Sequence, residues 1–154
     1  MAARLKRGVV AAVACALWAA AALATVQPAA ARTAGKQAWT EARVSPGLHS
    51  LNQAATVQHE PRAGTVPRGA VITQVLAQRD YAGSADVKTS LCWGTSGRCV
   101  DITGRALNTR AFEGLDASQP MRLVHRVTAW RGSHPPLYVK GNVTVWYALP
   151  EAVR

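Results

Sequence analysis

The chain has 154 residues, 49% of them hydrophobic, with three cysteines and a formal net charge of +10 at pH 7. A protein this basic could bind nucleic acid, but beyond the N-terminal segment its Lys and Arg residues stand singly, without a run of consecutive basic residues. Scattered positive charge is more typical of solubility, or of attraction to an anionic membrane or cell wall. We therefore expect no nucleic-acid partner.

Residues 1–31 have the features of a cleavable export signal. A basic start with three Lys and Arg residues precedes an uncharged, alanine-rich stretch, which ends at Pro28 and an Ala-Ala-Ala sequence. This order predicts a signal peptide cleaved after Ala31, and hence a periplasmic protein. An uncleaved anchor is disfavoured because the stretch is only weakly apolar, and a lipoprotein signal because too few apolar residues precede Cys15. The 123 residues that follow carry a net charge of +7 and suit one small domain.

Short strand patterns dominate the rest of the chain, and no segment has the pattern of a convincing amphipathic helix. The expected strands are Gln37–Val44, Ala70–Tyr81, Asp86–Trp93, Arg98–Thr103, Met121–Trp130, Leu137–Lys140 and Val143–Ala148, with a short extended piece at Thr109–Phe112. Turns are expected at Gly104–Asn108 and Gly141–Asn142, and 48–69 is expected to be loop with one edge strand at most.

These patterns predict an all-β protein, a small antiparallel β-sandwich or barrel-like domain with one disulfide-stapled hairpin. The expected division is a signal peptide at 1–31, a loop-rich N-terminal part of the mature domain at 32–69, the sandwich core at 70–148 and a C-terminal tail at 149–154.

Cys92 and Cys99 flank a connector with Gly94 and Gly97, which favour a tight reversal. The two arms can pair as antiparallel strands, and facing residues in such a ladder are close enough for a disulfide. Because Cys15 lies in the segment removed on export, the remaining pair is expected to be oxidised. On the chain-entropy account, closing so short a loop stabilises the fold by about 2.5 kcal/mol.

Little in the sequence indicates catalysis or metal binding. It holds no G-x-S-x-G, no H-E-x-x-H and no phosphate-binding glycine loop, and its four histidines lack ligand spacing. His49 and His59 are expected to be solvated loop residues, and His125 a hydrogen-bonded core residue. We expect no enzyme, no cofactor and no metal site; a thiol enzyme would need a free Cys92 or Cys99. Trp93 at the hairpin tip, with Arg98, is the candidate binding surface.

Several pieces of sequence, taken in order, resemble the flagellar protein FlhE family. They are Leu91-Cys92, Arg98-Cys99-Val100, Phe112-x-Gly114, Pro120-Met121-Arg122-Leu123, Leu137-x-Val139 and Val143-x-Val145-x-Tyr147, with a weaker likeness at Ala38-Trp39. The resemblance covers Ala70–Tyr147, and only the cysteine pair maps onto a marked family position. It implies a small periplasmic protein with a compact β-sandwich fold.

The resemblance also implies a function. It indicates a non-enzymatic accessory protein that supports flagellum assembly, limits proton leak through the flagellar type III export apparatus and acts in a chaperone-like manner on periplasmic parts such as the rod. The expected partners are export-apparatus or rod proteins, with membrane surface or cell wall as further contacts. The alternative is a carbohydrate- or peptidoglycan-binding module that stacks sugars on Trp93, Trp130 and Trp146. The oligomeric state stays open, a homodimer included.

Overall fold

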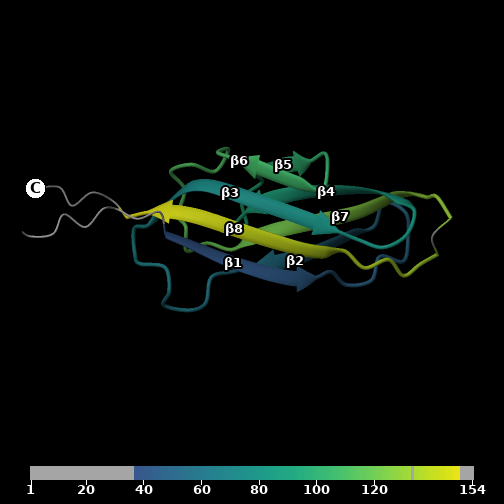
Figure 1. Cartoon of the computed structure of the whole chain (residues 1–154), viewed down its shortest axis with the longest axis horizontal. Coiled ribbons are helices and arrows are strands. Elements are labelled where there is room, and N and C mark those ends of the chain that lie inside the picture. The colour runs from purple at the N-terminus through teal and green to yellow at the C-terminus, as the bar shows by residue number, and fades with distance from the viewer. Residues whose placement is uncertain (1–36, 133, 150–154) are drawn as a thin grey trace, which may run out of the picture. The chain divides into compact units, whose positions relative to one another are not determined.

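The computed structural model describes residues 37–132 and 134–149, and in them the chain forms strands and no helix. The strands are β1 (Gln37–Val44), β2 (Ala54–His59), β3 (Val71–Asp80), β4 (Ala85–Trp93), β5 (Cys99–Ile102), β6 (Ala106–Thr109), β7 (Met121–Trp130) and β8 (Lys140–Ala148). Figure 1 shows them as two stacked layers. No helix in these residues is long and apolar enough to cross a membrane.

The strands form two four-stranded antiparallel sheets, in the orders β1-β8-β3-β6 and β2-β7-β4-β5. We call them the β8 sheet and the β7 sheet. The expected all-β antiparallel sandwich is therefore confirmed. The strands β1 and β2 come from the segment expected to be loop-rich, and each forms one edge of a sheet. The sandwich thus includes strands from before residue 70.

The two sheets pack through an alternation of buried and exposed residues. Along β4, Val87, Thr89 and Leu91 are buried, while the residues between them point outward. Along β7, Leu123 and His125 are among the fully buried residues. This alternation fills the space between the sheets with side chains from both, and Phe112 closes it from a loop.

Two expected turns are strands in the structure. Residues 106–108 of the expected turn Gly104–Asn108, together with Thr109, pair with β3 as the edge strand β6. Gly141–Asn142 lies inside β8 and not in a turn, because Gly141 faces the other sheet where a side chain would not fit. Conversely, the expected strand Leu137–Lys140 does not form as one. Leu137 makes only an isolated bridge to Leu48, and Lys140 begins β8.

The loops at one end of the sandwich join the two sheets. Backbone hydrogen bonds link Leu48 and Leu137 in both directions, at 2.8 and 3.0 Å, and Ser45 N donates to Val139 O. The start of β1 and the end of β8 lie at the opposite end, since Gln37 pairs with Tyr147. The expected signal peptide and residues 150–154 of the expected tail lie outside the described residues.

Candidate functional site

The disulfide hairpin has the form that the sequence predicted. Cys92 of β4 faces Cys99 of β5 in the ladder, and their sulfurs are bonded. Gly94 follows at a φ of 52°, a left-handed conformation that glycine adopts readily. Both cysteines are consumed in the bond, so neither offers a thiolate for nucleophilic chemistry.

Trp93 is half-buried beside this bond and does not project freely from the turn. Its indole Nε1 donates to Asp116 O at 3.1 Å, and its ring packs against the main core. The backbone N–H of Gly94 donates to Pro120 O at 2.8 Å. The hairpin tip is therefore tied to the loop 110–120, and the indole stays partly exposed.

The other candidate, Arg98, is exposed on the same tip. Behind it, Arg122 donates to Ser96 O at 3.5 Å, while its Nε is buried without a described partner. The tip thus combines the partly exposed indole of Trp93 with the guanidinium groups of Arg98 and Arg122. The Cys92–Cys99 disulfide holds it in place. The role of Trp93 and Arg98 in binding stays a prediction.

A chain of polar side chains, which the sequence did not reveal, crosses the interior from β3 to β7. Arg79 donates from Nε to Gly104 O at 2.7 Å and from one terminal nitrogen to Val87 O and Thr89 Oγ1. Thr89 Oγ1 lies 2.9 Å from His125 Nδ1. Because the threonine oxygen accepts from arginine, its own proton can go to His125 Nδ1.

His59 is the second buried histidine, and the expectation that it is solvated is wrong. It ends β2, is 0% exposed, and its Nδ1 lies 3.2 Å from Glu41 O. A carbonyl only accepts, so Nδ1 carries the proton. The sequence allowed one edge strand within 48–69 but did not show that His59 belongs to it, because Pro and Gly punctuate the region. His125 is buried as expected.

Burial lowers the pKa of both histidines. For His125, removal from water and the nearby charge of Arg79 lower the pKa to about 4. For His59, burial lowers the pKa, although the hydrogen bond to Glu41 opposes it. Nε2 of each ring is buried and has no hydrogen-bond partner among the described residues. These rings are neutral near pH 7, so they serve as core residues whose protonation disfavours the fold.

Two hollows in the described surface are open to solvent. One of about 270 Å³ lies beside Thr89 between β4 and β5, and one of about 400 Å³ lies beside Lys140 on the β8 sheet. Arg79 borders both. No group of three or more His, Cys, Asp or Glu residues that could hold a metal ion occurs in the described part of the chain.

The three tryptophans of the sugar-stacking alternative do not form one platform. Trp93 pairs with Met121 at one end of β7, whereas Trp130 ends the same strand. Nine strand steps separate these ends, a span of about 30 Å. Trp146 lies on β8, in the other sheet. This distribution removes the geometric basis for the carbohydrate-binding alternative.

Comparison with known proteins identifies the family. The sequence model described as "Flagellar protein FlhE" matches residues 48–148, most of the described strands. The chain belongs to the FlhE family. It is 25% identical over 120 residues to the flagellar protein FlhE of Escherichia coli (strain K12), covering 77% of this chain and 89% of that protein.

A solved structure agrees with this membership. The crystal structure of FlhE superposes with a TM-score of 0.60 at 24% identity, covering 76% of this chain and 100% of that one. At this identity the likeness concerns the fold, which is the same all-β sandwich. A flagellar accessory role follows from membership in the FlhE family, and an extracytoplasmic location is consistent with it.

Proposed function

We propose that this FlhE-family protein works in the periplasm, where it supports flagellum assembly and limits proton leak through the flagellar type III export apparatus. It does so by binding in a chaperone-like way and not by catalysis. The observation that carries this proposal is the family match over 48–148, which spans the stapled hairpin and both sheets. Its partners are protein parts of the export apparatus or the rod.

The hairpin tip is the proposed contact surface for these partners. It is held in place by the Cys92–Cys99 bond and by the Trp93 indole on Asp116 O, so little conformational entropy is lost when it binds. Half-buried tryptophan and exposed arginine are the residue types most enriched at energetically important interface positions. Arg98 supplies the charge.

Gene deletion in the protein's own host tests the proposal. Deletion is expected to reduce swarming and to let cytoplasmic pH fall further after an external acid shift. The pH effect should vanish in cells that lack the export apparatus, because the leak would then have no channel. Unchanged motility, swarming and cytoplasmic pH in flagellated cells would refute the proposed role.

Complementation then tests the tip. The Trp93→Ala/Arg98→Ala variant should restore the deletion strain less well than wild type. Its matched control is Arg105→Ala, a similarly exposed arginine away from the hairpin. Equal rescue by both variants, at equal protein levels, would move the contact surface elsewhere while leaving the role intact.

A further inference from the structure

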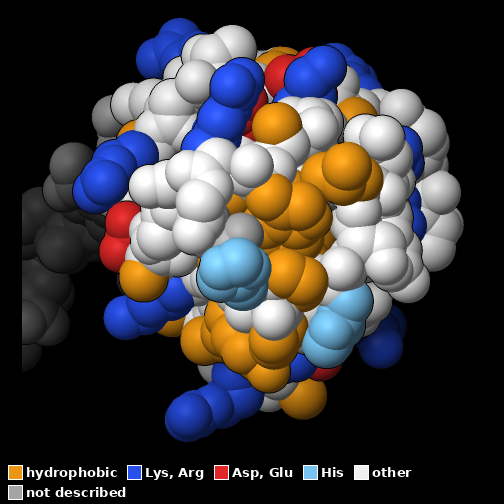
Figure 2. Space-filling model, turned by 90° about the vertical axis from the view of Figure 1, so that its right-hand side faces the viewer, with side chains coloured by type: hydrophobic (Ala, Val, Ile, Leu, Met, Phe, Trp, Pro, Cys, Tyr) orange, Lys and Arg blue, Asp and Glu red, His pale blue; other side chains and the backbone are white. Residues whose placement is uncertain are grey.

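Exposed apolar side chains gather at the end of the sandwich opposite the start of β1. We call this set the end patch; it consists of Val44, Gly47, His49, Leu51, Pro136 and Tyr138. The residues Val44, Leu51 and Tyr138 are 59%, 50% and 54% exposed. Figure 2 faces this end and shows hydrophobic side chains grouped with two histidines.

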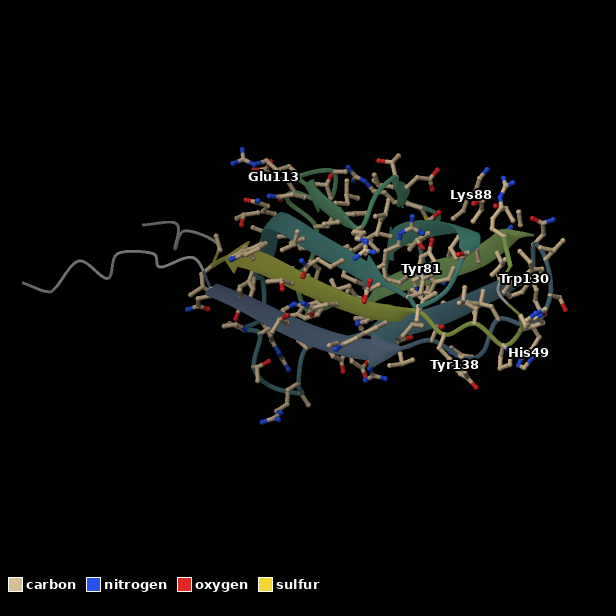
Figure 3. All side chains as sticks on the ribbon, turned by 45° about the vertical axis from the view of Figure 1, so that its right-hand side comes forward. His49, Tyr81, Lys88, Glu113, Trp130 and Tyr138 are labelled. Carbon is tan, nitrogen blue, oxygen red and sulfur yellow. A yellow bond between two sulfur atoms is a disulfide. The ribbon has the colours of Figure 1, made fainter. Side chains whose placement is uncertain are left out.

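Three other members of the end patch surround Gly47. A Cβ on this glycine would lie 3.0 Å from His49 Nε2, 3.0 Å from Pro136 Cβ and 3.5 Å from Tyr138 Cε1. The loops 45–53 and 134–139 therefore contribute to a single surface. Figure 3 shows His49, Tyr138 and Trp130 at this same end, with Glu113 at the other.

The apolar residues of the patch cannot turn inward. Residues Leu48, Leu137 and Val139 of the same loops fill the inward positions and are buried in a core cluster of their own. The backbone bonds between Leu48 and Leu137 fix this alternation, so Tyr138 is held outward. A rigid surface of this kind loses little side-chain freedom when something covers it.

A pair of positive charges borders the patch on the β7 sheet. Lys88 of β4 stands directly opposite Arg126 of β7 in the ladder. Both are exposed, and neither forms an ion pair with another described residue. Leu51 bridges to Val127, the neighbour of Arg126, which brings the apolar and basic groups together. Like charges placed opposite each other destabilise a ladder, and an external anion would relieve that repulsion.

We propose that this end of the protein docks onto a bilayer surface that contains anionic phospholipids. Tyrosine and tryptophan prefer the boundary between headgroups and acyl chains, because their rings are apolar and their tips polar. Lys88 and Arg126 on the β7 sheet, and Lys140 at the start of β8, would meet the phosphate groups, and Leu51 and Tyr138 would enter the boundary. Lys140 pairs with Val44 across β1 and β8. The inference goes beyond the flagellar role and does not depend on it.

Vesicle binding tests the proposal. The protein is purified from cells that make it, in the form that mass spectrometry identifies there, and is sedimented with vesicles of phosphatidylethanolamine and phosphatidylglycerol or of phosphatidylcholine alone. Binding to the anionic vesicles is expected, with loss on raising salt. Each lost cation should weaken binding about fivefold, so Lys88→Gln/Arg126→Gln should weaken it about 25-fold. Leu51→Ser/Tyr138→Ser should weaken it about tenfold.

Matched controls lie at the other end of the molecule. Arg98→Gln/Arg110→Gln removes as much charge, and Leu149→Ser removes a leucine that is 49% exposed. Both should bind as wild type does. Equal binding to both kinds of vesicle, or equal loss in the controls, would overturn the proposal. The proposal would also be overturned if an end-patch variant changed the molar mass of the protein in analytical ultracentrifugation but not its binding to vesicles. That result would indicate that the patch binds a second copy of the chain.

A measurement on the unmutated protein covers the case of a variant that folds poorly. Brominated lipids quench tryptophans at the bilayer boundary, and Trp130 lies at the docking end. The proposal is supported if brominated anionic vesicles quench the tryptophan fluorescence of the wild type, and quench that of Trp130→Phe less. No quenching by brominated anionic vesicles contradicts it.

Discussion

Gly141 of β8 lies directly against Leu123 of β7, and a Cβ on this glycine would come 2.5 Å from Leu123 Cδ1. His59 Nε2 would be 3.3 Å from the same Cβ. Leu123 and His59 are both 0% exposed, so neither has room to withdraw. The two sheets approach closely here because residue 141 lacks a side chain.

Gly141→Ala should therefore destabilise the protein, although alanine favours a strand at least as well as glycine does. Overpacking of this kind costs about 1–3 kcal/mol of the free energy of unfolding, measured by urea titration. Gly104→Ala is the control, because no atom lies within 4 Å of its Cβ position. Leu123→Val in the Gly141→Ala background should recover part of the loss. Equal stability of the two glycine variants would contradict the packing account.

The second prediction concerns the disulfide. Cys92→Ser/Cys99→Ser should lower the free energy of unfolding by about 2.5 kcal/mol, since the bond closes a short loop of sequence separation 7. The hairpin should keep its register, because Leu91 remains fully buried and opposite Val100. A thiol reagent should label neither cysteine in the native protein. Labelling of Cys92 or Cys99 without reductant would show that the bond is absent.

The sequence predicted the sandwich and its stapled hairpin because local patterns carry that information. The alternation of Val87, Thr89 and Leu91 with polar residues defines one buried face, and the glycines after Cys92 define the turn. Strand periodicity and turn chemistry act over a few residues, so they can be recognised without knowledge of the partner strands.

What the sequence did not predict depends on contacts between distant residues. Gly141 resembles a turn residue until Leu123 of the other sheet is in place. His59 resembles a loop residue until β1 supplies Glu41 O. The end patch is likewise assembled from loops about ninety residues apart in sequence, such as those of Leu48 and Leu137, and no local pattern could bring them together.

The third prediction concerns Thr89. Thr89→Val keeps the shape of the side chain but removes the hydroxyl between Arg79 and His125 Nδ1. Both ring nitrogens of His125 would then be buried without a partner, since Nε2 already has none among the described residues. Leaving a buried polar group unpaired costs about 1–3 kcal/mol. Thr89→Ser, which keeps the hydroxyl, should lose less stability than Thr89→Val; the reverse order would rule out the polar chain.

The buried histidines make stability depend on pH. The pKa of His125 is about 4 in the fold and 6.5 for an unperturbed histidine, so between these values the unfolded chain binds more protons. The stabilisation is complete above about pH 6.5 and is lost as pH falls toward 4, by about 3 kcal/mol in all. His59, whose pKa is also lowered by burial, acts in the same direction.

Urea titrations at intervals between pH 7.5 and pH 4 measure this slope. His125→Asn should flatten it, because the amide oxygen can accept from Thr89 but does not titrate. His49→Asn, at an exposed histidine, is the control for the substitution itself. Glu41 and Asp116 have a lowered carboxyl pKa and add their own loss only at lower pH, below their usual values of 4.5 and 3.8. A slope between pH 6.5 and 5 that survives in His125→Asn/His59→Asn would assign the proton uptake to other groups.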